Sequence, residues 1–153
     1  MWPWAGCKNM RLLLDCPVDW LLSQEAHYIY SNCMYDKAYD AYQKRIVNYI
    51  KHPQTKCFHC VDEGEKVGIV IFEISNDCIE ILGIAVHSSY RGQGIGSFMV
   101  KEALIVLHPK KLIVKTDDDA IGFYLKNGFR ITEKNIQAYP DDEVIRYTCV
   151  LEQ

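Results

Sequence analysis

The residues best placed to do chemistry form a glycine-rich segment in the middle of the chain. It lies between a β-rich run and an amphipathic helical pattern, and it reads Arg91, Gly92, Gln93, Gly94, Ile95, Gly96, Ser97. Glycines let the backbone turn tightly and bring several N–H groups close to a ligand. The positive end of the following helix and the Arg91 cation both attract anions. The segment therefore predicts a binding site for the phosphates of a cofactor.

Two common phosphate-binding patterns do not fit this segment. A P-loop requires GxxxxGK[ST], and no lysine with a hydroxyl residue follows these glycines. A dinucleotide-binding fingerprint requires GxGxxG, but the last required glycine, counted from Gly92, is Ser97. A plain strand-to-helix turn remains as the alternative without a ligand.

The segment and its surroundings resemble the GNAT superfamily of acyl-CoA-dependent N-acetyltransferases, in particular its small, bacterial-type single-domain members. Arg91 to Gly96 match the cofactor signature [RQ]-x-x-G-x-[GA] in full, and Ile81 to Tyr90 are similar to the fourth strand of the family and its polar turn. Asp117 to Phe129 resemble the motif N-x-x-A-x-x-x-Y-x-x-x-G-F, with Asp117 in place of asparagine. The resemblance spans about Arg11 to Leu151 and is specific from Ile79 to Phe129.

This resemblance implies transfer of an acetyl group from acetyl-CoA, as co-substrate, to a primary amine of a small molecule or peptide. The amine would attack directly in a ternary complex, without a metal. Backbone groups of Ile84, Ala85 and Val86 would run beside the pantetheine arm, with the Val86 N–H near the thioester carbonyl. The alternatives are a non-catalytic acyl-CoA-binding module, favoured only by Asp117, and a protein-interaction scaffold.

By resemblance, two side chains are the catalytic candidates. Tyr124 aligns with the tyrosine that lies near the CoA sulfur and serves as general acid, although a core tyrosine packed beside Phe123 and Phe129 would give the same pattern. Glu80, six residues before Val86, is the candidate general base. Ordered water is the alternative base, and Glu73 on the neighbouring strand is a weaker one.

Two further residues are expected at the cofactor. Lys126 is placed to reach a phosphate, as basic residues on this helix do in relatives, but exposed helix lysines usually have no specific role. Asp117 lacks the amide donors of asparagine and adds negative charge, so affinity for CoA should fall if its side chain points inward.

The acceptor-binding region is the least shared part of the family. Its first helices are rich in aromatic and acidic residues, which would suit a cationic amine: Tyr28, Tyr30, Tyr35, Asp36, Tyr39, Asp40, Tyr42. The competing interpretation is packing, because Tyr39, Tyr42 and Tyr49 share one helical stripe.

The order of elements predicts an α+β fold of the GNAT type, with a mixed, mostly antiparallel sheet of about six to seven strands flanked by about four helices. Strands are expected at Arg11–Leu14, Lys56–Asp62, Lys66–Ser75, Cys78–His87, Lys111–Lys115, Phe129–Gln137 and Val144–Leu151. Helices are expected at Val18–Cys33, with breaks, and at Lys37–Lys51, Ile95–Leu107 and Asp119–Asn127. The predicted apolar faces of the second and third helices include Ile50 and Val106.

Composition sets the remaining limits. A chain of 153 residues with a formal net charge of −3 predicts one globular domain and no nucleic-acid partner. No apolar run approaches the roughly 20 residues of a membrane helix. Residues 1–9 are expected to be a disordered leader without secretory character, before an alternative start at Met10, and 10–153 the single domain. A homodimer is left open.

Cysteine usage predicts the compartment. Seven cysteines form an odd set without a disulfide spacing, which favours free thiols in the cytoplasm. Cys57 and Cys60 have CxxC spacing, but no second ligand pair accompanies them. Two ordinary strand cysteines are therefore preferred to a metal or redox site.

Overall fold

The computed structural model describes residues 10–153, apart from the side chain of Tyr139, so the leader predicted for residues 1–9 lies outside the described residues. The strands are β1 (Arg11–Asp15), β2 (Thr55–Asp62), β3 (Glu65–Ser75), β4 (Cys78–Val86), β5 (Lys111–Asp117), β6 (Arg130–Tyr139) and β7 (Asp142–Glu152). The α-helices are α1 (Val18–Leu21), α2 (Gln24–Tyr30), α3 (Tyr39–Lys51), α4 (Ile95–Leu107) and α5 (Ile121–Lys126), with 3-10 helices η2 (Ser31–Cys33) and η3 (Ser88–Tyr90).

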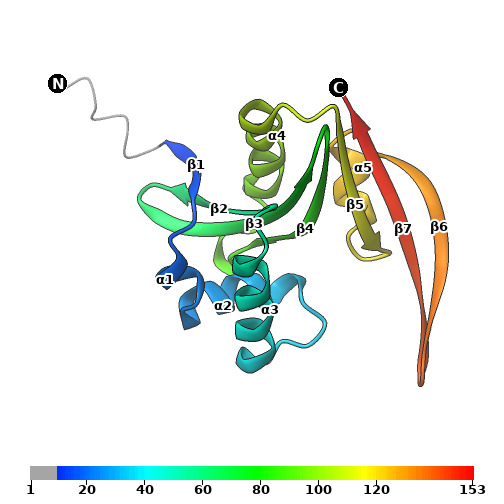
Figure 1. The fold of residues 1–153 in the computed structure, drawn as a ribbon, viewed down its shortest axis with the longest axis horizontal. Coiled ribbons are helices and arrows are strands. Elements are labelled where there is room, and N and C mark those ends of the chain that lie inside the picture. Colours follow the sequence, from blue (N-terminus) through cyan, green and yellow to red (C-terminus); the bar gives the residue numbers. More distant parts are fainter. Residues whose placement is uncertain (1–9) are drawn as a thin grey trace.

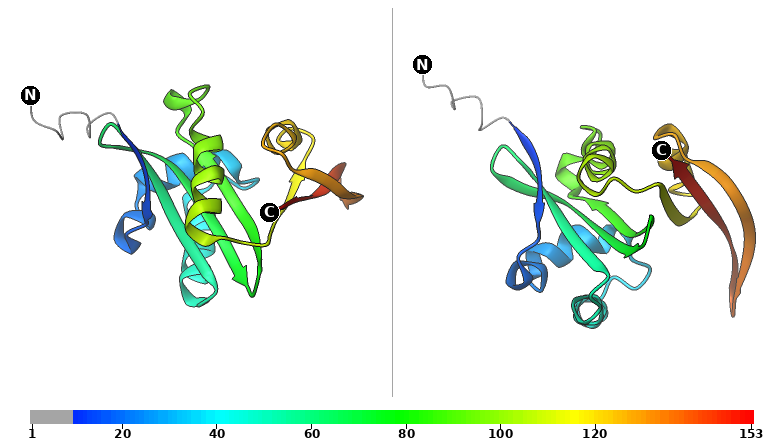
Figure 2. Two further views of the ribbon diagram at one scale, coloured as in Figure 1. Left: turned by 90° about the horizontal axis from the view of Figure 1, so that it is seen from above. Right: turned by 45° about the horizontal axis from the view of Figure 1, so that its top comes forward.

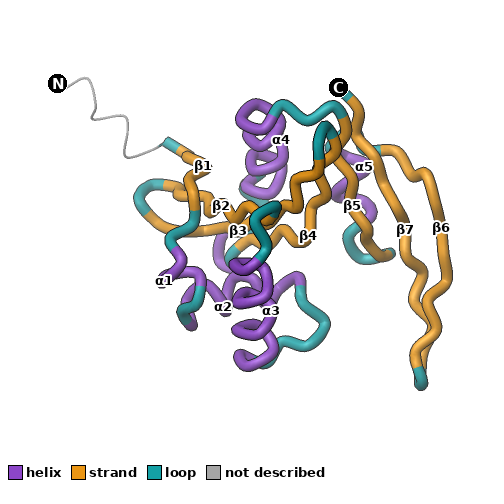
Figure 3. The backbone as a smooth tube through the Cα atoms, in the orientation of Figure 1, coloured by secondary structure: helices purple, strands orange, loops and turns teal. Residues whose placement is uncertain are grey.

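The predicted α+β fold is confirmed, with a seven-stranded sheet in the order β1-β2-β3-β4-β5-β7-β6 (Figure 1). Only β4 and β5 pair in parallel; the other neighbours are antiparallel. β5 pairs with Arg146–Glu152 of β7, so the β6–β7 hairpin continues beyond β5 as a two-stranded arm (Figure 3).

The first predicted helix is divided in two by a side-chain cap. Ser23 precedes α2, and its Oγ accepts a hydrogen bond from the Ala26 N–H at 3.2 Å. An N-cap of this kind starts a new helix, because it satisfies an N–H that has no partner within the helix. The described residues therefore contain five α-helices where about four were expected.

Helices cover both faces of the β1–β4 part of the sheet (Figure 2). One core lies between the sheet and α4 and α5, and includes Phe72, Met99 and Phe129. The other lies between the sheet and α1 to α3, and includes Tyr30, Tyr42 and Ile69. The sheet thus holds α4 on one face and the amino-terminal helices on the other.

Two residues expected on buried helix faces are exposed. Ile50 is 42% and Val106 52% exposed. Both lie in the last turn of their helices, and Val100, which was not predicted as part of the apolar face, is buried on α4 instead. The helical period was right, but it does not tell which turns face the sheet.

The CxxC cysteines are strand residues, as preferred from the sequence. Both lie on β2, where Cys60 belongs to the α4-side core and Cys57 packs against the opposite core. Burial raises the pKa of each thiol to about 11. Two thiols on opposite faces of one strand cannot coordinate one metal ion. Within residues 10–153, no helix combines the length and apolar character that a membrane span requires.

Candidate active site

The open edge of β4 is the main feature of the site. β4 pairs with β5 only from Cys78 to Ile81, opposite Lys111–Val114. The β3–β4 register then shifts between Ile71 and Phe72, which places an extra β4 residue at Leu82. Beyond this bulge β4 and β5 diverge (Figure 1), so the backbone from Gly83 to Val86 has no strand partner on that side within residues 10–153.

Side-chain packing fixes this part of β4. Ala85 is buried in the core of the amino-terminal helices, while Ile84 and Val86 pack towards the α4-side core. The His87 N–H donates to the Val67 carbonyl of β3 at 2.7 Å. Backbone polar groups alternate in direction along a strand, and the N–H of His87 points towards β3. The backbone groups of Ile84 and Val86 therefore face the open edge. The three predicted β4 residues therefore lie where an extended ligand could pair as an added strand.

The glycine-rich segment connects η3 to α4 beside this edge. Gly92 and Gly94 have φ angles of 78° and 77°, in the left-handed region that favours glycine. Gly94 is the N-cap of α4, and no side chain caps the helix. The first N–H groups of α4, starting at Ile95, Gly96 and Ser97, are therefore free of a capping side chain and suit an anion.

Two arginines lie at this loop, and only one was predicted. Arg91 donates to the Asn32 Oδ1 of η2 at 2.8 Å. Arg11 of β1 donates to the Gln93 carbonyl at 2.6 Å and forms an ion pair with Asp62 at 3.4 Å. Sequence reasoning missed Arg11 and Asn32, which lie 82 and 59 positions from their partners. No local signal in the sequence could have indicated either contact.

Tyr124 lies in the α4-side core, where its side chain is 5% exposed and its ring contacts Phe123 and Phe129. Burial raises the pKa of Tyr124 well above its ordinary value, and the nearby Cys33 adds to the shift. The phenol is therefore protonated at neutral pH and remains a donor. The packing interpretation is thus correct for the ring, and it is compatible with an acidic role for the hydroxyl.

The other predicted site residues are more dispersed. Glu80 is half-buried in the paired part of β4, directly opposite Glu73 of β3. Asp117 ends β5, where its Oδ1 accepts the N–H groups of Asp119 and Ala120, each at 3.1 Å. Lys126 is exposed in the last turn of α5. An asparagine Oδ1 could accept the same two hydrogen bonds. The replacement of the asparagine of the family motif by Asp117 therefore preserves the turn that starts α5.

The tyrosines of the expected acceptor region divide into two groups. Tyr30 and Tyr42 are fully buried, and the Tyr39 hydroxyl donates to the Leu22 carbonyl at 2.8 Å, so these three pack the core. Tyr28 is exposed and donates to or accepts from Ser88 Oγ at 2.8 Å. The aromatic stripe is therefore mostly structural, as the packing interpretation expected.

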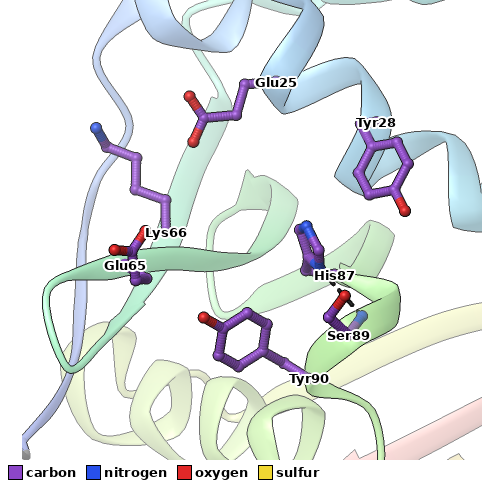
Figure 4. Close-up of a pocket in the computed structure, with 7 residues that line it drawn as sticks. All are labelled: Glu25, Tyr28, Glu65, Lys66, His87, Ser89 and Tyr90. Carbon is purple, nitrogen blue, oxygen red and sulfur yellow. Dashed lines mark hydrogen bonds between the residues drawn. The ribbon is translucent and has the colours of Figure 1, made fainter.

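Tyr28 also lines a separate hollow of about 400 Å3 between α2, the start of β3 and η3 (Figure 4). Its lining residues are Glu25, Tyr28, Glu65, Lys66, His87, Ser89 and Tyr90. None of them is among the residues predicted to bind the cofactor. The hollow combines two carboxylates with aromatic rings, but Lys66 stands over the Trp20 ring at 5.2 Å and adds a positive charge.

Comparisons with known proteins bear on the fold and the family of the chain. The model of the acetyltransferase (GNAT) family matches residues 18–129. The ribosomal-protein-S18-alanine N-acetyltransferase of Escherichia coli has a similar structure, with a TM-score of 0.78 at 18% identity over 94% of each chain. The dodecameric spermidine N-acetyltransferase of Vibrio cholerae gives a TM-score of 0.72 at 15% identity over 94% of each chain.

A third structure, a GNAT family acetyltransferase of Elizabethkingia anophelis with acetyl-CoA bound, gives a TM-score of 0.70 at 18% identity. It is matched over 94% of this chain and 98% of that one. No curated protein sequence matches. The seven-stranded mixed sheet and its helices form the fold of the GNAT acyltransferases. The chain belongs to the acetyltransferase (GNAT) family.

Proposed function

We propose that this protein is an N-acetyltransferase that uses acetyl-CoA to acetylate a primary amine through a ternary complex. The observation that carries the proposal is the presence of two surfaces suited to a ligand, one on β4 and one at the start of α4. The open edge of β4 offers unpaired backbone groups, and the uncapped start of α4 follows in the chain after η3 and the glycine-rich segment. An extended arm ending in a pyrophosphate matches both surfaces.

The chain's own residues suit the chemistry of this reaction. The Gly83–Val86 backbone offers N–H groups that can stabilise the oxyanion formed when an amine attacks a thioester carbonyl. Tyr124 keeps its proton at neutral pH and can donate it to the departing thiolate. Glu80 is the candidate base, with ordered water as the alternative. Acetyl-CoA supplies the activated acyl group.

A non-catalytic acyl-CoA-binding module is the second candidate, and its support rests on Asp117. That support is weak, because Asp117 makes two capping hydrogen bonds that asparagine would also make. By their names, similar structures act on an alanine of ribosomal protein S18 and on spermidine, which favours an amine acceptor without choosing one. A homodimer also remains a proposal.

The test follows CoA thiol release from acetyl-CoA across polyamines, aminoglycosides, amino acids and peptides, for the wild type and Tyr124→Phe. The variant keeps the ring and loses only the hydroxyl, so we expect kcat to fall about 100-fold, within the range for one general acid. Unchanged kcat would remove Tyr124 from catalysis.

Thermal stabilisation by acetyl-CoA, measured in parallel, separates the alternatives. Stabilisation without turnover on any amine would favour the binding module. Absence of both stabilisation and turnover would favour a scaffold. A Glu80→Gln variant tests the general base. If the rate no longer increases with increasing pH, Glu80 is supported as the base; an unchanged pH–rate profile supports ordered water.

A further inference from the structure

The hollow between α2, the start of β3 and η3 has no part in the proposed reaction (Figure 4). Its volume of about 400 Å3 is within the range of small-molecule sites in proteins, roughly 300–1,000 Å3. It lies where β4 is paired with β3, since the His87 N–H donates to the Val67 carbonyl, whereas the cofactor is expected at the other, open edge of β4. The hollow is therefore a second concave surface beside the expected transfer site.

Aromatic rings from α2 and from the segment around η3 meet at this hollow. The ring centroids of Tyr28 and His87 are 5.0 Å apart, and those of His87 and Tyr90 are 5.5 Å apart. The Tyr28 hydroxyl shares a hydrogen bond with Ser88 Oγ at 2.8 Å, and His87 Nδ1 accepts the Ser89 N–H at 3.1 Å. These bonds hold the rings in place before any ligand arrives. Aromatic faces of this kind attract organic cations.

The charges at the hollow also favour a cation. Its lining has two carboxylates, Glu25 and Glu65, and one ammonium, Lys66, so its formal charge is −1 (−2 + 1). Within residues 10–153, neither carboxylate has an ion-pair partner. The Lys66 Nζ lies 5.2 Å from the centroid of the Trp20 ring, which does not line the hollow. In Figure 4 the Glu25 carboxylate points from α2 into the hollow, while the Lys66 ammonium lies at its edge.

We propose that this hollow binds an organic ammonium ion, which lies against the three rings and beside the Glu25 carboxylate. A trimethylammonium group fits this lining, because it is weakly hydrated and binds aromatic faces well. A metal ion does not, because it needs several ligands close together and no group of three His, Cys, Asp or Glu side chains within residues 10–153 could supply them. The ligand needs no reacting nitrogen, so the proposal does not rest on acyl transfer.

The experiment titrates the 15N-labelled full chain, without acetyl-CoA, and follows its amide resonances by NMR. Choline is the probe, and two matched compounds separate its properties: 3,3-dimethylbutanol has the same shape without the charge, and sodium chloride has the charge without the methyl groups. We expect saturable shifts with choline at Glu25, Ser89 and Tyr90, with a dissociation constant on the order of millimolar. The neutral alcohol should bind about tenfold more weakly, and sodium should give no saturable shift.

Variants of two exposed lining residues test the contacts. Glu25→Gln removes the charge and Tyr28→Leu removes one ring, and each should weaken choline binding about threefold to tenfold. Both positions are exposed, and the amide spectrum itself reports whether each variant is folded. Glu133→Gln, which removes an exposed carboxylate on β6, is the control and should keep the wild-type affinity.

Several outcomes would overturn the proposal. Equal affinity for choline and the neutral alcohol would mean that the charge is not recognised, and absence of saturable shifts would mean that the hollow binds no such ion. Shifts confined to Gly83–Val86 would place choline at the open edge of β4 instead. Wild-type affinity in both Glu25→Gln and Tyr28→Leu would reject these residues as its contacts. None of these results changes the test of acyl transfer, which is measured by thiol release.

Discussion

At the scale of single residues, the loop before α4 depends on contacts that no motif contains. Arg91 was predicted as a fixed cation, and the structure holds it through Asn32 from η2. Asn32 also donates to the Ile29 carbonyl at 3.0 Å, so its amide is oriented by the end of the preceding helix α2. The residue types of the loop could be recognised from their spacing. Their partners could not, because they come from segments that only the folded sheet brings close.

The charge of Arg91 can be tested with two acyl donors. In Arg91→Met, KM for acetyl-CoA should rise about tenfold with little change in kcat, because a charge-assisted bond to phosphate contributes about 1.5–3 kcal/mol before solvent screening. With acetyl-pantetheine, which lacks the pyrophosphate, the variant should match the wild type. The assay is steady-state thiol release with each donor.

Arg130→Met is the control for this prediction. Arg130 forms an exposed ion pair with Glu152 at 2.6 Å on the β6–β7 side of the sheet, away from the loop. Its removal should leave KM for both donors unchanged. An equal rise in KM for acetyl-CoA and acetyl-pantetheine in Arg91→Met would mean that the arginine does not act on the pyrophosphate.

At the scale of elements, the sequence predicted what local chemistry determines. The bounds of α4, Ile95–Leu107, agree with the structure because Gly94 and Pro109 frame the helix. The other elements are right to within a few residues. The divergence of β4 from β5 was not predicted from the residue pattern. The pairing of β4 depends on β5, whose Lys111 lies 33 residues after its partner Cys78 (111 − 78), and the bulge at Leu82 depends on the register with β3. The candidate residues could thus be named from the sequence, while the divergence of the strands beside them could not.

The packing of α5 on α4 depends on one glycine. A Cβ at Gly96 would lie 2.8 Å from Cε1 of Phe123, the residue before Tyr124. The family signature admits alanine at this position, but here the aromatic ring fills the space. Gly96→Ala should therefore displace α5, cost about 1–3 kcal/mol of unfolding free energy and lower kcat. Urea unfolding and kcat measure the two effects.

Two further variants complete this test. A Cβ at Gly122 meets no atom within 4 Å, so Gly122→Ala, in α5 itself, should leave stability unchanged or raise it slightly. Adding Phe123→Leu to Gly96→Ala should restore part of the lost kcat, because the smaller side chain makes room for the methyl group. A double variant as impaired as the single one would show that Phe123 is not the cause.

At the scale of the whole molecule, one sheet supports two cores, and β1 forms one edge of it with β2 beside it. His59 of β2 is buried there at 4% exposure, with its ring 5.5 Å from that of Trp20. Its Nδ1 has no partner among the described residues. Burial lowers the pKa of His59, and the nearby Lys66 cation lowers it further. The folded state therefore favours the neutral ring.

This burial predicts a loss of stability in mild acid. Because the pKa of His59 is lower in the folded than in the unfolded chain, the unfolded state binds the proton more readily. Stability is complete above the unfolded value of 6.5 and declines as the pH falls below it, by at most about 1.4 kcal/mol per pH unit for one proton. Urea unfolding between pH 7.5 and 5 measures the slope of the unfolding free energy against pH, and the stability of His59→Phe should be less pH-dependent than that of the wild type.

His52, exposed at the end of α3, provides the control: His52→Asn should keep the wild-type slope. If His59→Phe kept it as well, the proton responsible would bind elsewhere, and the β1–β2 edge would not limit stability in acid.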